Sequence, residues 1–214
     1  MTRGPIILFE GLDRTGKSTQ TESLVDALRR VGIGAELFRF PNRETGLGKM
    51  INAYLTGGSL NDETAHLLFS ANRWECKDAL VASSEAGNAV VIDRYIFSGV
   101  AYSAAKGLER EWCVSPDLGL PSPDIVIFFK FKDTAKATER GQYGEERYEK
   151  VEFQKLVRHE FEKFEEESSG SWNVVYVDDK PIAEVAEEVW QIVGSVCEKG
   201  IEDEIRPFQW EFKK

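Results

Sequence analysis

Five short apolar runs, rich in β-branched and aromatic residues, recur along the chain: PIILF, AELFRF, AVVID, DIVIFFKF and WNVVYV. The segments between them have helical periodicity, since Leu24, Leu28 and Val31 share one helical face. A second amphipathic helix, after the last run, is marked by Ile182, Val185, Val189, Ile192 and Val196. Strands this apolar, alternating with helices, indicate a parallel sheet covered on both faces. We therefore predict the α/β class, with a three-layer α/β/α domain and a five-stranded parallel sheet.

The length and charge of the chain narrow its function class. At 214 residues it can bury one sizeable core, so we expect a single domain over residues 1–214. Its 37 acidic and 27 basic residues give a net charge of -10, which disfavours nucleic acid or an anionic membrane as the main partner. An anionic ligand must therefore meet a local cluster of positive charge.

The cysteines and the apolar runs bear on the cellular compartment. Cys76, Cys113 and Cys197 lie far apart without CxxC spacing, which argues against a disulfide framework or a zinc site. The first apolar run stops at Glu10, too soon for a signal peptide, and no stretch approaches the ~20 apolar residues of a membrane span. We expect a cytoplasmic location, with the nucleus as an alternative, and no membrane partner.

A glycine-rich loop, GLDRTGKST, directly follows the first apolar run. It fits the pattern G-x-x-x-x-G-K-[ST] at every fixed position, between a strand and a helix. Gly11 and Gly16 allow backbone N–H groups to turn toward phosphate oxygens, Lys17 can reach the β- and γ-phosphates, and the Ser18 hydroxyl can ligate Mg²⁺. The loop predicts a P-loop NTPase fold and a site for a nucleotide with Mg²⁺.

The run AVVIDRY places an acidic residue at the end of a buried strand. Asp93 at the carboxyl end of a strand beside the P-loop strand is suited to hold Mg²⁺, directly or through water. Taken alone, an aspartate at a strand end more often caps a helix or forms a turn. The adjoining Arg94 favours the functional interpretation, because its guanidinium can clamp the phosphates that must meet.

The segment HLLFSANRWE carries an aromatic ring and a planar cation one helical turn apart. Phe69 and Arg73 are at positions i and i+4, with Asn72 beside them, so they can stack on a base and donate to its edge. Without further context, Phe69 is a core residue and Arg73 a surface ion-pair partner. We expect a structural role for His66, which has no sequence neighbour that forms a nucleophile or metal pair.

Two segments look mobile in the sequence. The first is RGQYGEER, over residues 140–147, where glycines bracket the centre. The second is the tail from about Lys199 onward, which contains Pro207 and Trp210 but no pattern that predicts a structure.

Five segments taken together resemble a known family. FEGLDRTGKSTQ, RFPNRETGLGK, HLLFSANRWE, VIDRYIFSGVAY and RGQYGEERYE, in this order and at these separations, are similar to thymidylate kinases of the eukaryotic type. The resemblance runs from Ile6 to about Val196. It implies transfer of the γ-phosphoryl group of ATP·Mg²⁺ to the 5′-phosphate of dTMP, in dTTP synthesis, by a homodimer packed through helices.

The resemblance also implies an acceptor site for dTMP. In it, Phe69 stacks on thymine, Arg73 donates to a base carbonyl, Asp13 accepts from the 3′-OH of the sugar, and Tyr102 closes the space beside C2′. The implied acceptor-site residues are Asp13, Phe40, Pro41, Arg43, Phe69, Asn72, Arg73, Arg94, Ser98, Gly99, Tyr102, Tyr148 and Gln154.

The donor side follows from the same resemblance, with a short lid at about 140–147. That lid has no basic residue between Arg140 and Arg147, so Arg14 of the P-loop is the better candidate for stabilising charge in the transition state. The implied ATP-binding residues are Gly11, Arg14, Thr15, Gly16, Lys17, Ser18, Thr19, Arg140 and Lys180. The implied catalytic residues are Asp13, Arg14, Lys17, Asp93 and Arg94, with Ser18 and Asp93 as metal ligands.

Three other interpretations compete with this one. Another nucleoside-monophosphate or deoxynucleoside kinase would keep Lys17, Ser18 and Asp93 and differ mainly in its base pocket. A small-GTPase switch would need N-K-x-D and a D-x-x-G after its second core strand, and the sequence has neither. A catalytically silent scaffold is disfavoured because each catalytic position holds a chemically competent residue.

Overall fold

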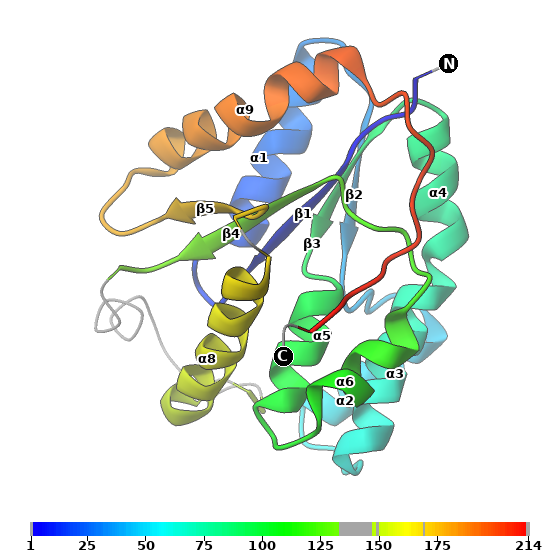
Figure 1. Cartoon of the computed structure of the whole chain (residues 1–214), viewed down its shortest axis with the longest axis vertical. Coiled ribbons are helices and arrows are strands. Elements are labelled where there is room, and N and C mark those ends of the chain that lie inside the picture. Colours follow the sequence, from blue (N-terminus) through cyan, green and yellow to red (C-terminus); the bar gives the residue numbers. More distant parts are fainter. Residues whose placement is uncertain (1, 133–146, 149, 169, 213–214) are drawn as a thin grey trace.

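The five apolar runs form the strands of one parallel sheet. The computed structural model describes residues 2–132, 147–148, 150–168 and 170–212. The strands are β1 (Ile6–Gly11), β2 (Ala35–Arg39), β3 (Ala89–Asp93), β4 (Ile125–Lys130) and β5 (Asn173–Tyr176). Their order across the sheet is β2-β3-β1-β4-β5, and all pairs are parallel (Figure 1). The predicted five-stranded parallel sheet is confirmed.

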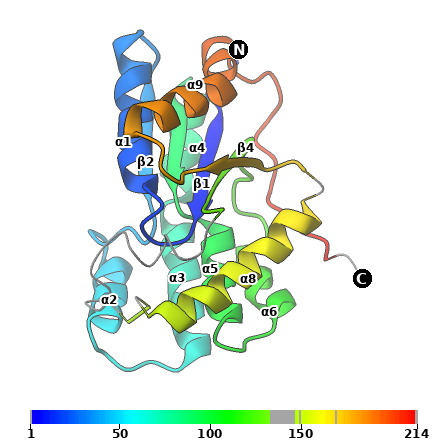
Figure 2. The same ribbon diagram turned by 90° about the vertical axis from the view of Figure 1, so that its left-hand side faces the viewer.

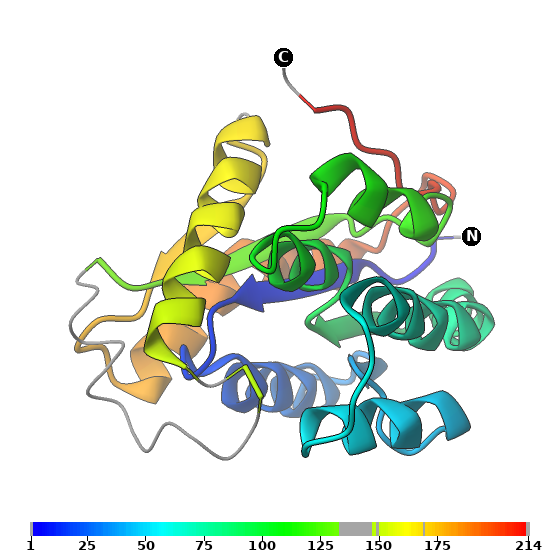
Figure 3. The same cartoon turned by 90° about the horizontal axis from the view of Figure 1, so that it is seen from below.

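Helices cover both faces of this sheet. They are α1 (Lys17–Arg30), α2 (Gly46–Leu55), α3 (Asp62–Glu75), α4 (Lys77–Glu85), α5 (Ile96–Ala104), α6 (Arg110–Val114), α8 (Val151–Glu167) and α9 (Ile182–Lys199), with a 3₁₀ turn, η1 (Ser115–Asp117). Helices α1 and α9 pack together on one side (Figure 2). In Figure 3, α8 and the α2–α3 pair stand on opposite sides of α5.

Alternation along β1 explains the two layers of core. Ile7 and Phe9 face the cluster that contains Leu24 of α1 and Val189 of α9. Ile6 and Leu8 belong to the opposite cluster, with side chains from α4, α5 and α8. Because successive side chains of a strand point to opposite faces, one fully apolar strand supplies both layers. The three-layer α/β/α prediction is confirmed.

Details of the two predicted helical faces differ in the structure. Val31 is 59% exposed because α1 ends at Arg30, and Ile182 is 62% exposed at the first position of α9. The buried face of α9 consists of Val185, Val189, Val193, Gly194 and Cys197. Val31 and Ile182 lie at the ends of their helices, where the helix no longer packs against the sheet, so their side chains need not face the core.

The tail after α9 is ordered, and the expectation that it is mobile is wrong as far as residue 212. Ile201 exchanges two backbone hydrogen bonds of 2.9 Å with Arg3. Farther along, Phe208 is 3% exposed, and the Trp210 ring lies 5.2 Å from Phe97 and 5.3 Å from Phe164. The aromatic side chains bury enough apolar surface to hold this segment, which Figure 1 shows in red beside the lower helices.

The remaining features concern the cysteines and membranes. Cys76, Cys113 and Cys197 are buried free thiols. Within the ranges that the structure describes, no helix combines the length and apolarity needed to cross a bilayer.

Candidate active site

The P-loop connects β1 to α1 at the centre of the sheet. Gly11 and Gly16 have φ angles of 139° and 90°, which residues other than glycine rarely adopt. A Cβ atom on Gly11 would also lie 2.4 Å from the carbonyl oxygen of Phe129 on β4. Both glycines are therefore needed for the turn, and the Gly11 position additionally needs close backbone approach.

Lys17 is folded back into this loop. Its ammonium is buried and donates to the Leu12 carbonyl at 2.5 Å and to the Thr15 hydroxyl at 3.2 Å. Burial, followed by the nearby charge of Arg94, lowers the pKa of Lys17 to about 7, although neighbouring carboxylates act in the other direction. An anionic phosphate beside Lys17 would favour its charged form.

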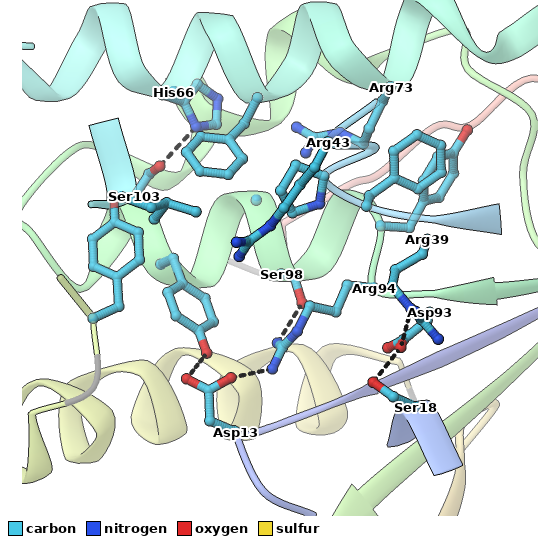
Figure 4. A pocket seen from close by; sticks show the side chains of 18 of the residues that line it. Asp13, Ser18, Arg39, Arg43, His66, Arg73, Asp93, Arg94, Ser98 and Ser103 are labelled. Carbon is cyan, nitrogen blue, oxygen red and sulfur yellow. Dashed lines mark hydrogen bonds and ion pairs between the residues drawn. The ribbon is translucent and has the colours of Figure 1, made fainter. Parts of the chain in front are cut away.

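Parallel pairing brings the end of β3 beside the P-loop. Ser18 Oγ donates to Asp93 Oδ2 at 2.7 Å, and Asp93 also accepts from Arg39 Nε at 3.2 Å (Figure 4). Two adjacent oxygen atoms of this kind fit Mg²⁺, which often takes one or two protein oxygens and completes its shell with phosphate and water. Within the described residues, no group of three or more His, Cys, Asp and Glu side chains is placed to hold a metal. The Ser18 hydroxyl and the Asp93 carboxylate are therefore residues that could hold a metal ion together with phosphate oxygens.

Asp13 lies at the centre of a polar network. Its carboxylate accepts from Arg94 Nη2, from the Tyr102 hydroxyl at 2.9 Å and from the Gln154 amide at 2.8 Å. Burial by itself would raise the pKa of Asp13, but the charges of Arg94 and Lys17 and these hydrogen bonds outweigh it and hold the pKa below its usual value. The P-loop thus presents an ionised acceptor between α5 and α8.

Glu10, a residue that the sequence reasoning did not identify, supports this network. Its fully buried carboxylate accepts from the backbone N–H groups of Tyr95 and Ser98, each at 3.0 Å, and from the Ser98 hydroxyl at 2.5 Å. Burial raises its pKa, and the hydrogen bonds from Ser98 oppose that rise. Glu10 caps the start of α5, whose later residues line the site. A carboxylate at the end of an otherwise apolar strand was the sequence signal.

A cavity of about 240 Å³ extends from this network to α3. Eleven of the predicted acceptor-site residues line it: Asp13, Phe40, Pro41, Arg43, Phe69, Arg73, Arg94, Ser98, Gly99, Tyr102 and Tyr148. Residues far apart in the sequence thus meet around one space large enough for a small ligand. Ser18 and Asp93 also line the cavity, so it reaches the phosphate loop.

Two other predicted acceptor-site residues are outside the cavity lining. Gln154 reaches it indirectly through Asp13. Asn72 is fully buried, accepts from the Asn42 backbone N–H at 2.7 Å and donates to the Asn42 carbonyl at 3.1 Å. Asn72 therefore holds the loop that carries Arg43, instead of projecting beside Arg73.

The α3 wall of the cavity is fixed by buried polar contacts. Arg73 pairs with Asp117, and His66 Nε2 donates to the Cys113 carbonyl at 2.8 Å. His66 Nδ1 accepts from the Ser103 hydroxyl at 2.8 Å (Figure 4). Burial, together with the charge of Arg73, lowers the pKa of His66 to about 4. These contacts fit the expected structural role of His66, although its ring also lines the cavity.

The residues predicted to bind ATP lie farther apart in the structure than the predicted acceptor-site residues. Arg14 has a φ of 65° at the turn of the loop, and the Thr15 hydroxyl donates to the Leu12 carbonyl at 3.0 Å. Thr19 is exposed on α1. Lys180 lies just before α9 and donates to Glu188 at 2.5 Å. Arg140 lies outside the described residues, as does the lid except Arg147, which donates to the carbonyls of Tyr54 and Gly58 beside α2.

Comparison with known proteins agrees with this geometry. The family model described as thymidylate kinase matches residues 9–189. Thymidylate kinase of Schizosaccharomyces pombe is 54% identical over 166 residues, 77% of this chain and 79% of the relative. The Homo sapiens thymidylate kinase is 43% identical over 189 residues, 87% of this chain and 88% of the relative. The solved thymidylate kinase from Candida albicans has a TM-score of 0.86 at 36% identity, with coverage of 98% of this chain and 100% of that one. The chain therefore belongs to the thymidylate kinase family and has its P-loop fold.

Proposed function

We propose that this enzyme transfers the γ-phosphoryl group of ATP to the 5′-phosphate of dTMP, giving ADP and dTDP on the route to dTTP. The observation that carries the proposal is the single cavity that joins Phe69 and Arg73 at one end to Ser18, Asp93 and Arg94 at the other. Family membership supports the same reaction.

The acceptor nucleotide fits the cavity with its base toward α3. Phe69 provides a ring face for stacking, and Arg73 provides N–H groups for a carbonyl oxygen of the base. Asp13, held as a carboxylate, accepts from the 3′-OH of the deoxyribose. Tyr102, whose hydroxyl donates a hydrogen bond to Asp13, occupies the space beside C2′ of the sugar.

The phosphate groups meet at the P-loop end of the cavity. Arg43 and Arg94 bind the acceptor phosphate, because both guanidinium groups line the cavity and can form paired hydrogen bonds. Lys17 and the backbone N–H groups of the loop bind the β- and γ-phosphates of ATP. Ser18 and Asp93 would hold Mg²⁺, which would neutralise charge on the β- and γ-phosphates. Arg14 stabilises the charge that spreads over the transferring group.

We also propose a single-domain homodimer in the cytoplasm or nucleus. The dimer is supported by exposed apolar side chains on the α2–α3 side, where Met50, Leu67 and Trp74 are 56%, 46% and 36% exposed. Sedimentation of the purified protein tests this assembly, and Leu67→Glu should shift a dimer toward monomer. A wild-type monomer at micromolar concentration would contradict it.

The test of the activity is ADP release from ATP·Mg²⁺ with a panel of acceptors: dTMP, dUMP, dCMP, dGMP, UMP and AMP. We expect strong turnover with dTMP, weaker turnover with dUMP and little with the others. The Candida albicans enzyme is described as broad in substrate specificity, so the panel covers several different bases. Preference for another acceptor would leave the P-loop chemistry in place and identify a different nucleoside-monophosphate kinase.

A further inference from the structure

Arg73 is held at the cavity wall by a residue with no assigned role. Arg73 Nε donates to Asp117 Oδ1 at 3.1 Å, and Arg73 Nη2 donates to Asp117 Oδ2 at 2.5 Å. Asp117 lies in η1, 44 positions away in the sequence, and accepts a third hydrogen bond from the Ser70 hydroxyl at 2.7 Å. Asp117 is fully buried and Arg73 is only 3% exposed, so neither group can exchange its partner for bulk water.

This pairing determines which edge of the guanidinium faces the cavity. Asp117 occupies the edge formed by Nε and Nη2, which leaves the N–H groups of Nη1 for another acceptor. Arg73 Nη1 has no hydrogen-bond partner among residues 2–132 or the later described ranges. Figure 4 shows Arg73 extending from α3 into the pocket.

The guanidinium of Arg73 also lies close to Gly99 of α5. A Cβ atom at this position would lie 2.6 Å from Arg73 Nη2 and 2.7 Å from Nη1. Gly99 therefore leaves room for the guanidinium in the position where Asp117 holds it. Asp117 and Gly99 together define one position for the donor edge of Arg73.

Stability alone does not explain such a pair. Removing two charges from water is costly, and a buried ion pair is often no more stabilising than apolar residues of similar volume. A pair in this position instead provides a preorganised donor, since the cost of fixing the guanidinium is met during folding and not during ligand binding.

We propose that Asp117 is a positioning residue that sets the base selectivity of the acceptor site. By fixing Arg73, it presents N–H donors where a thymine or uracil offers its carbonyl oxygen O4. Cytosine has an amino group at that position, so two donors would face each other and its binding would be disfavoured. This inference rests on the proposed function, because it assumes that the base of a pyrimidine monophosphate lies against Arg73.

The test uses Asp117→Asn with a matched control elsewhere in the fold. Asp124 also holds an arginine by two hydrogen bonds, accepting from Arg3 Nη1 and Nη2 at 2.7 Å each, but it does not line the cavity. Asp124→Asn therefore weakens a comparable ion pair without touching the base site. For each variant, kcat and KM are measured with dTMP, dCMP and ATP.

We expect Asp117→Asn to raise the KM for dTMP roughly tenfold and to lower the ratio of kcat/KM for dTMP over dCMP by a similar factor. The KM for ATP should stay unchanged. Asp124→Asn should leave the ratio at its wild-type value. Ser70→Ala, a milder change that removes only one hydrogen bond to Asp117, should lower the ratio in the same direction and gives a readout even if Asp117→Asn does not fold.

A double variant separates positioning from a general loss of structure. If Asp117 acts through Arg73, adding Asp117→Asn to Arg73→Ala should leave the dTMP-to-dCMP ratio where Arg73→Ala alone puts it. A further fall of the ratio in the double variant would overturn the inference. So would an unchanged ratio in Asp117→Asn or, if that variant does not fold, in Ser70→Ala. Failure of wild-type protein to phosphorylate dTMP would instead contradict the proposed function.

Discussion

Arg73 and Arg94 each pair with an aspartate at the wall of the same cavity, but the two pairs have different surroundings. Asp117 is fully buried and accepts only from Arg73 and Ser70 among the described side chains. Asp13, at the other end, is 26% exposed and is shared among three side chains. The ion pair at the base end is therefore closed to water, whereas the Asp13 carboxylate at the phosphate end is partly exposed and shared among several donors.

This difference matches two separate tasks. Selection between bases depends on donors and acceptors that hold one geometry before the ligand binds. Phosphoryl transfer requires cations and hydrogen-bond donors that are placed where negative charge develops in the transition state. Substitutions at the phosphate end should then lower the rate of reaction, and substitutions at the base end should change selection or local stability.

The largest effect should come from Arg14 at the phosphate end. Arg14→Ala should lower kcat about 10³-fold and leave the KM for dTMP nearly unchanged, because the interaction belongs to the transition state. Steady-state kinetics with dTMP measures both constants, and Arg14→Lys shows how much the planar guanidinium contributes beyond its charge. Unchanged turnover with weaker dTMP binding would make Arg14 only a binding residue.

The pH dependence of the free energy of unfolding tests whether the buried contacts of His66 at the base end are rigid. Burial lowers its pKa from 6.5 in the unfolded chain to about 4, so the unfolded state binds more protons between these values. The contribution of His66 to the free energy of unfolding should therefore fall by about 3 kcal/mol as the pH falls from 6.5 to 4, because His66 becomes protonated in the unfolded chain. Urea unfolding of wild type and His66→Gln at pH 7 and pH 4.5 isolates this contribution.

His66→Gln should lose less stability than wild type over that pH interval, because glutamine does not titrate. Equal losses in the two proteins would show that His66 can become protonated in the folded state without a cost. The base end would then be less rigid than its hydrogen bonds indicate.

Asp13→Asn should have the smallest effect and should depend on the acceptor. Loss of the carboxylate weakens the hydrogen bond from the 3′-OH, so kcat/KM for dTMP should fall about tenfold further than kcat/KM for 3′-deoxy-dTMP. Any disturbance of Arg94 affects both acceptors and cancels in their ratio. Equal losses for the two acceptors would show that Asp13 does not contact the 3′-OH.

Local features of the sequence were enough to predict much of this molecule. Each strand is an apolar run that can be recognised from its own residues. The spacing from Gly11 to Ser18 likewise identifies the phosphate-binding loop without any information about its neighbours in space. The position of Asp93 beside Ser18 also followed, because neighbouring parallel strands end at one edge of the sheet.

Features that depend on distant partners were not predictable in this way. Asp117 follows a proline in an unremarkable turn, and only the packing of η1 against α3 brings it to Arg73. Trp210 has no periodic neighbours, and two of its aromatic partners, Phe97 and Phe164, come from α5 and α8. In both cases the signal lies in tertiary contacts between segments that are far apart in the chain.

A competition assay is the most direct test of whether base selection and reaction rate depend on different ends of the cavity. Wild type and Arg14→Ala are each given ATP·Mg²⁺ with equal concentrations of dTMP and dCMP, and the dTDP and dCDP formed are separated and counted. We expect dTDP to exceed dCDP by at least about 100-fold in both proteins, while the total product of Arg14→Ala falls sharply. A ratio near one in wild type, or a ratio that collapses in Arg14→Ala, would contradict the account.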